Sequence, residues 1–306
     1  MMLTIHARAA GISLLAAALC LASGTVAPGQ TTLRYKFKEG ESLKYALTMN
    51  TQQTDIIGGA QNTSGTTQEM DLAWTIKGVK AGQADIVQKI TRLHHKLEVS
   101  GVPRWEFDSK SGKKPSGAVG KDLNPLLEAL ASAELALKMD AQGQTTDPRL
   151  FHKMLEAIKA NPNLAPAWSP LSAERISHTL QQPLLIFPKE PVVKGKTWNK
   201  KTESQLSNGF ILKVDTTFTY SGPETRNKQA LEKIEAKSVL TVEPGDRVGL
   251  TPMLLSATAG GTSYFDNQAG RLLESTQTQK IALEFKAGGQ TYGASRDQTI
   301  TLKFVR

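Results

Sequence analysis

Two aspartates, Asp108 and Asp266, are the acids whose placement could support chemistry. Each follows a phenylalanine and opens a turn that ends in a glycine, Gly112 in the first case and Gly270 in the second. If the two carboxylates met, they could act as a general acid and base in a hydrolase. The same pattern is typical of a turn in which aspartate accepts backbone N–H bonds and glycine takes a positive φ, and we favour this structural interpretation.

The other reactive residues do not form a recognisable catalytic or metal-binding pattern. His94 and His95 are adjacent, so on a strand they point to opposite faces and cannot readily close on one metal ion. Ser111 and Lys114 have the spacing of a nucleophile pair, but a glycine lies between them where a helix would be needed. The segment 112–122 lacks the first glycine and the Ser/Thr of a phosphate-binding loop. We therefore expect no metal, no cofactor and no enzymatic activity.

A second group of candidates consists of aromatic residues on segments in which apolar and polar residues alternate. Such alternation predicts half-buried strands, whose inward residues form a core. On a curved sheet the same residues could instead line an apolar pocket, and the two interpretations stay open. These residues are Trp74, Trp105, Phe107, Phe218, Tyr220 and Phe265.

The strands that carry these residues lie in two parts of the chain that are similar to each other in sequence. Residues 105–113 match residues 263–271, both reading aromatic, Phe, Asp, polar, then Gly and a cation. Two further segments, 39–43 and 70–78, match 194–198 and 214–222 in the same order. Self-similarity of this kind indicates a duplicated supersecondary unit. The expected fold class is α+β, mostly β, with two tandem antiparallel curved-sheet, half-barrel-like repeats and helices between and around the first.

These matches divide the chain into four expected parts. Residues 1–27 form a signal peptide, 31–147 the first β-rich unit, 148–189 a helical connector and 190–306 the second β-rich unit. Within the first unit, leucines at helical spacing predict a helix over 123–130. The Gly, Asn, Ser and Thr residues of 58–65 predict a flexible hairpin loop.

The N-terminus has the features of a secretory signal. A cation, Arg8, precedes a Leu- and Ala-rich run that is long enough for a signal and short for a membrane-spanning helix. Cleavage is expected between Ala22 and Gly29, which places the protein in the periplasm or outside the cell without a transmembrane segment. Cys20 ends the apolar run, but the bulky Leu19 before it argues against lipidation. The mature chain then has no cysteine and cannot form a disulfide.

Four segments of the chain resemble an uncharacterised family of exported bacterial proteins, described as a domain of unknown function. They are residues 33–40, 107–112, 191–198 and 264–272. The resemblance implies export but no activity or site residues. A weaker likeness, limited to strand, Phe-Asp turn, glycine and strand, is to periplasmic lipoprotein carriers, whose half-barrels hold acyl chains.

Charge and composition narrow the functional classes. The net charge is +9, and loss of Arg8 with the signal peptide leaves +8. This balance is compatible with an anionic surface as a partner, but the lysines are spread along the chain, and the interpretation that they solvate strand faces is the stronger one. The cluster Lys110, Lys113, Lys114 and Lys121 has few aromatics near it, which argues against nucleic acid. We expect a non-catalytic binding or carrier protein for an apolar or amphipathic ligand, such as a lipid, of the bacterial cell envelope. The alternatives are a structural or protein-interaction module of the envelope and, third, a hydrolase using Asp108 and Asp266.

Overall fold

The computed structural model describes residues 29–150, 180, 182–205, 211–244, 252–287 and 290–306. The expected signal peptide, 1–27, and most of the expected helical connector, 151–179 and 181, lie outside the described residues. The described part of the chain is dominated by antiparallel strands, with one long helix among them.

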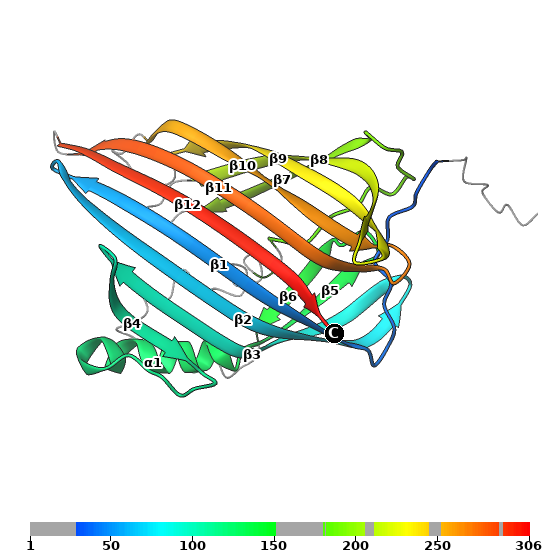
Figure 1. Ribbon diagram of the computed structural model, residues 1–306, viewed down its shortest axis with the longest axis horizontal. Coiled ribbons are helices and arrows are strands. Elements are labelled where there is room, and N and C mark those ends of the chain that lie inside the picture. Colours follow the sequence, from blue (N-terminus) through cyan, green and yellow to red (C-terminus); the bar gives the residue numbers. More distant parts are fainter. Residues whose placement is uncertain (1–28, 151–179, 181, 206–210, 245–251, 288–289) are drawn as a thin grey trace, which may run out of the picture.

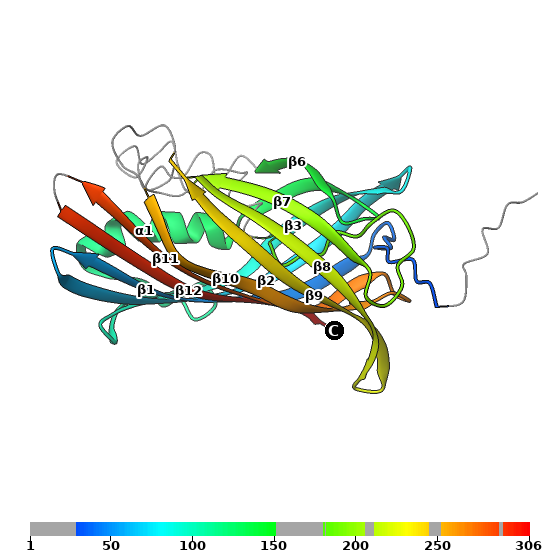
Figure 2. The same cartoon turned by 90° about the horizontal axis from the view of Figure 1, so that it is seen from above.

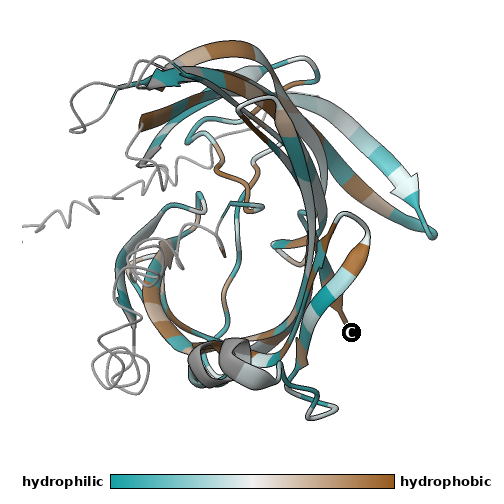
Figure 3. Ribbon diagram, turned by 90° about the vertical axis from the view of Figure 1, so that its left-hand side faces the viewer, coloured by the Kyte–Doolittle hydropathy of each residue, from teal (hydrophilic) through white to brown (hydrophobic). Residues whose placement is uncertain are grey.

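The strands form a single open sheet with the order β6-β5-β3-β2-β1-β12-β11-β10-β9-β8-β7, and β4 pairs with the end of β3 (Figure 1). The sheet curves round into an open trough (Figure 3). The strands are β1 (Ser42–Ile57), β2 (Ala60–Lys80), β3 (Gln83–Val99), β4 (Val102–Asp108), β5 (Glu134–Asp140), β6 (Thr145–Leu150), β7 (Thr197–Gln205), β8 (Ile211–Arg226), β9 (Gln229–Glu243), β10 (Pro252–Asp266), β11 (Arg271–Ala287) and β12 (Gln290–Val305).

Alternation of apolar and polar residues accounts for the strands. In β1, Leu43, Tyr45 and Leu47 are buried while the residues between them are more exposed. The expectation of a flexible loop over 58–65 is wrong, because the turn consists of Gly58 and Gly59 alone and β2 begins at Ala60. Both glycines have positive φ, as the central residues of a type I′ hairpin turn do, and the polar residues after them continue the β1·β2 ladder.

The two halves of the sheet meet where β1 pairs with β12, in a register that includes Tyr45↔Phe304 and Leu47↔Leu302. The sequence indicated two tandem sheets, whereas the structure shows one continuous sheet. One cluster of buried residues runs across both halves. The physical reason is that β1 is an edge strand of the first unit and β12 an edge strand of the second, and pairing of these two edges satisfies both rows of backbone groups.

Segments that match in sequence carry the same backbone hydrogen bonds. Before β1, Gly40 N donates to Ile76 O and Ile76 N donates to Glu41 O. Before β7, Gly195 N donates to Tyr220 O and Tyr220 N donates to Lys196 O. A β-bulge follows in each half, between Ile76 and Gly78 in one and between Tyr220 and Gly222 in the other. Beyond its bulge, the β8–β9 hairpin extends away from the neighbouring strands (Figure 2).

One end of the trough is filled by two irregular segments. Residues 31–37 bring Leu33 and Tyr35 into the core, and residues 184–192 bring Leu185 and Phe187. The ring of Tyr35 lies 5.4 Å from that of Phe187 and 5.2 Å from that of Phe265, measured between ring centres. This end of the trough is therefore a packed core.

The expected helix is confirmed as α1 (Gly117–Ala131), whose leucines Leu126, Leu127 and Leu130 are buried and which packs against β3. The first residues of the expected helical connector, Pro148 to Leu150, belong to strand β6.

No helix in the described part of the chain is both long enough and apolar enough to cross a membrane.

Candidate functional site

The inner face of the trough changes character along its strands. Residues directly opposite each other on antiparallel strands share a face, so the pairing defines rows across the sheet. One such row, the core row, is at most 5% exposed at every position. From β8 to β3 it contains Tyr220, Ile234, Ser263, Ser275, Leu302, Leu47, Met70 and Leu93.

A second row, which we call the polar belt, lies four residues from the core row on each strand, always on the side away from the packed core. Its members are Lys200, Thr216, Ser238, Ala259, Gln279, Gln298, Thr51 and Thr66. Two hydrogen bonds run along it, Thr216 Oγ1 to Ser238 Oγ at 2.8 Å and Gln298 Nε2 to Thr51 Oγ1 at 3.1 Å. The inner face is thus mainly apolar at the end of the trough that the packed core fills, which we call the closed end. At a rise of ~3.4 Å per residue, the polar belt lies about 14 Å from the core row.

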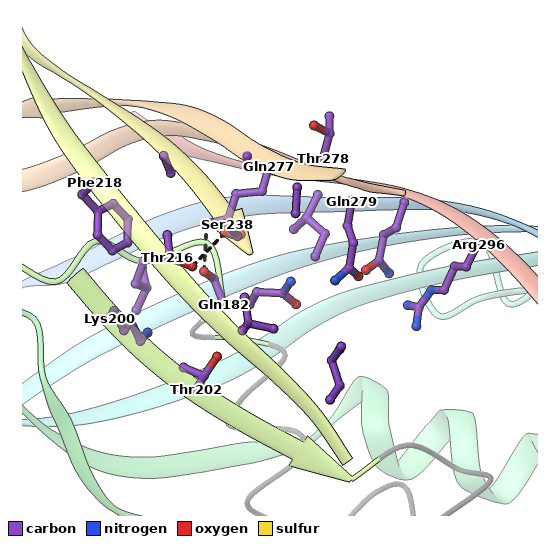
Figure 4. Close-up of a pocket in the computed structure, with 18 residues that line it drawn as sticks. Gln182, Lys200, Thr202, Thr216, Phe218, Ser238, Gln277, Thr278, Gln279 and Arg296 are labelled. Carbon is purple, nitrogen blue, oxygen red and sulfur yellow. Dashed lines mark hydrogen bonds between the residues drawn. The ribbon is translucent and has the colours of Figure 1, made fainter. Parts of the chain in front are cut away.

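A hollow of about 260 Å³ lies over the part of the belt between β7 and β12 (Figure 4). Its floor is low because β9 and β10 contribute Ala236, Ala259 and Gly260 where neighbouring strands carry larger side chains. Leu212, Val214, Phe218 and Ile300 supply apolar surface, and glutamines, threonines and serine supply polar groups. An amphipathic lining of this kind is typical of small-molecule sites.

Two cations face this hollow, Lys200 from β7 and Arg296 from β12 (Figure 4). Both side chains are half-buried, and burial lowers the pKa of each. Within the described ranges neither forms a salt bridge, and Arg296 Nε, which is fully buried, has no hydrogen-bond acceptor. The hollow therefore holds positive charge that the described residues do not neutralise.

The six aromatic candidates are mostly core residues. Trp74, Phe107 and Phe265 are at most 2% exposed, and Tyr220 belongs to the core row. Phe218 is buried and also lines the hollow. Trp105 is half-buried, and its ring lies 4.9 Å from that of His95. The structure thus places one of the six at the candidate site.

Asp108 is held by an arginine. Arg92 donates from Nε to Oδ1 at 3.3 Å and from Nη2 to Oδ2 at 3.1 Å, and Lys110 N donates to Oδ1 at 2.9 Å. The hydrogen bonds from Arg92 lower the pKa of Asp108 to about 2. Gly112 closes the turn with a φ of 75°. The carboxylate therefore stays ionised and stabilises the turn.

Asp266 plays a comparable part in the second turn. It accepts hydrogen bonds from Ala269 N at 2.9 Å and from Gln229 Nε2 at 2.6 Å, and Gly270 has a φ of 67°. Four strands, β2, β1, β12 and β11, lie between β10, which ends at Asp266, and β3, with which the strand of Asp108 pairs. The structure does not bring the two carboxylates together.

The two histidines point to different environments. His94 Nδ1 lies 3.2 Å from Glu69 Oε2, and its Nε2 lies 3.1 Å from Glu106 Oε1. His95 is on the other face, where burial lowers its pKa to about 4. In the described ranges no group of His, Cys, Asp and Glu side chains is arranged to hold a metal ion.

Sequence reasoning missed the cations of the hollow, although a signal was present. Lys200 lies two residues after Trp198, and Thr216 two residues before Phe218, so each polar residue shares a face with an inward aromatic. The small residues 256–262 on β10 were a second signal for a low floor.

The geometry defines an open, curved antiparallel sheet with a partly filled inner face. No protein-family model matches the sequence, and no curated protein matches it. Among solved structures, lipovitellin, described for its lipid–protein interactions, is similar with a TM-score of 0.50 and 14% identity, over 89% of this chain and 26% of that chain. This chain thus spans about a quarter of the length of lipovitellin, and at this identity the likeness concerns the fold.

Two bacterial proteins also match. An outer membrane channel from Pseudomonas putida F1 has a TM-score of 0.23 and 8% identity, over 89% of this chain and 97% of that chain. Pseudomonas aeruginosa OccK5 (OpdH) has a TM-score of 0.23 and 6% identity, over 88% of this chain and 99% of that chain.

Proposed function

We propose that this chain is a non-catalytic binding or carrier protein for an amphipathic ligand of the cell envelope. The observation that carries the proposal is the hollow over the polar belt, where apolar side chains and neutral or cationic polar groups line one space. A molecule with an apolar part and a polar head matches both kinds of lining. Lipovitellin, which has a similar fold, was described for its lipid–protein interactions, in keeping with this proposal.

The proposal also covers the export of the protein and the family to which it belongs. We propose that residues 1–27 are a cleaved signal peptide and that the protein belongs to the exported bacterial family it resembles. We also propose that the sheet arose from two copies of one unit, which the matching hydrogen bonds of Gly40 and Gly195 support. The separation of Asp108 from Asp266 supports a non-enzymatic function, because a carboxylate pair must converge to act together.

Native mass spectrometry of the mature protein, purified from its own envelope, tests the proposal when it is followed by extraction of any bound molecule. We expect a stoichiometric amphiphile. Ala236→Leu places a larger side chain on the floor of the hollow and should displace that molecule. Val239→Leu is the matched control, because Val239 lies on the same strand, is 70% exposed and does not line the hollow.

A protein that is ligand-free when purified and also fails to take up fluorescent fatty acids would contradict a carrier function. An interaction module of the envelope would then be the better explanation, with β6 and β7 as the strands at the two edges of the sheet. Equal retention of ligand by wild type and Ala236→Leu would place the binding site elsewhere.

A further inference from the structure

The distribution of charge on β7, β8, β11 and β12 differs between the two faces of the sheet. On the outer face, Lys201 pairs with Asp215 at 3.6 Å and Lys280 with Asp297 at 2.9 Å. On the inner face, the residues that line the hollow include two cations, Lys200 and Arg296, and no Asp or Glu. Lys201 and Lys280 thus have acidic partners on the outer face, whereas the two inner cations have no described acidic partner.

The acid closest to Arg296 along the inner face of the neighbouring strand β1 is Asp55. It lies diagonally from Arg296, because Gln53 is opposite Arg296 and Asp55 is opposite Ala294. Both oxygens of Asp55 accept hydrogen bonds from Gln53 Nε2, at 3.0 and 3.1 Å. Asp55 makes no described ion pair with Arg296, so the guanidinium remains available to the hollow.

Burial without a partner is unfavourable for a cation, which is why burial lowers the pKa of both groups. An anion in the hollow would remove this cost. Beside Arg296 the adjacent row supplies the amides of Gln279 and Gln298, which can donate further hydrogen bonds to an oxyanion. Arg is well suited to a carboxylate or phosphate because its donors form a planar fork.

We infer that the hollow selects amphiphiles with an anionic head, a carboxylate or a phosphate, which Arg296 binds with Gln279 and Gln298 while Lys200 adds positive charge from the opposite side. The inference rests on the proposed carrier function and names its ligand class. The hollow, at about 260 Å³, is slightly smaller than typical ligand sites of roughly 300 to 1,000 Å³, so it suits a head group with the adjoining part of a chain and not a whole lipid.

Calorimetric titration of the mature protein with decanoate, decyl phosphate and 1-decanol tests the inference, because the three share one chain and differ in the head. We expect at least one anion to bind about 10- to 100-fold more tightly than the alcohol, as for a hydrogen bond to a charged group. A preference for decanoate or for decyl phosphate identifies the head. Arg296→Gln should remove most of the preference, Lys200→Gln should reduce it, and Arg296→Lys should restore part of it.

Lys201→Gln and Lys280→Gln are matched controls, since each removes one outer-face cation beside the strand positions that face the hollow. Both should keep the anion preference of the wild type. If all three amphiphiles bind equally and Arg296→Gln changes nothing, the inference is overturned while the carrier function stands. If none of the three binds, both the inference and the carrier function are overturned. Unfolding midpoints near that of wild type confirm that each variant is folded.

Discussion

Phe265 is the residue whose loss should affect the closed end of the trough most. It is fully buried, and its ring lies edge-on to Phe187 at 4.7 Å and to Tyr35 at 5.2 Å between centres. The three rings come from β10, from residues 184–192 and from residues 31–37. Replacement of Phe265 by alanine thus removes contacts among three distant parts of the chain.

The expected cost follows from these contacts. Burial of a phenylalanine contributes about 1.5–3 kcal/mol and each aromatic pair about 0.5–1.5 kcal/mol, so Phe265→Ala should lower the free energy of unfolding by about 3–5 kcal/mol. Phe265→Leu keeps much of the volume but loses both ring pairs, and should cost about 1–3 kcal/mol. Guanidinium unfolding measures both, and at an m-value of roughly 5 kcal/mol per M a loss of 4 kcal/mol shifts the midpoint by about 0.8 M.

Val239→Ala provides the control, because this side chain is 70% exposed and should change stability by less than about 0.5 kcal/mol. A loss below about 1 kcal/mol for Phe265→Ala, with an unchanged m-value, would refute the packing argument. So would equal losses for the alanine and leucine variants, because the ring pairs and the volume would then not contribute separately.

Three further predictions concern the turns and the titrating groups. Gly270→Ala should cost more than Gly59→Ala in an unfolding titration, because both glycines have positive φ but only at Gly270 would a Cβ meet another residue, Lys36, at 2.4 Å; equal costs would contradict this. His95 has its pKa lowered to about 4 from an ordinary 6.5, so its neutral form is the folded one and stability should fall as pH falls from 6.5 towards 4. His95→Phe should flatten that part of the stability profile, and an unchanged profile would rule the argument out. Asp108 has its pKa lowered to about 2 from 3.8, so its contribution is complete above pH 3.8 and is lost as pH falls towards 2. Asp108→Asn should be less stable at neutral pH and vary less between pH 4 and 2, which acid titration followed by circular dichroism can check.

Local structure was largely predictable because it depends on neighbours in sequence. Leu43, Tyr45 and Leu47 alternate with polar residues, and this alone predicts the face that β1 buries. The helical spacing of Leu126 and Leu130 predicts α1 in the same way. The polar stretch 60–65 was wrongly predicted to be a loop, because backbone pairing with β1 outweighs the low strand propensity of its Gly, Asn and Ser.

The arrangement of strands could not be obtained in this way. Nothing near Tyr45 indicates that Phe304 will lie beside it, since pairing between distant segments depends on which strand edges remain free after each half has formed. The polar belt depends on the same pairing, because Gln298 and Thr51 meet only across β1 and β12. The belt as a whole is thus a property of the joined sheet, whereas the residues that line the hollow all lie between 182 and 300 and come from one half of it.

The seam between β1 and β12 also has a consequence for the order of folding. The pair Tyr45↔Phe304 joins residues that are far apart in the sequence, and contacts of such large separation form slowly because a long loop must close first. Until β12 has been synthesised, β1 presents an open row of backbone N–H and C=O groups that another chain could pair with. Completion of the sheet, and with it the polar belt, therefore waits for β12, and until then the exposed edge of β1 is a site at which chains could aggregate.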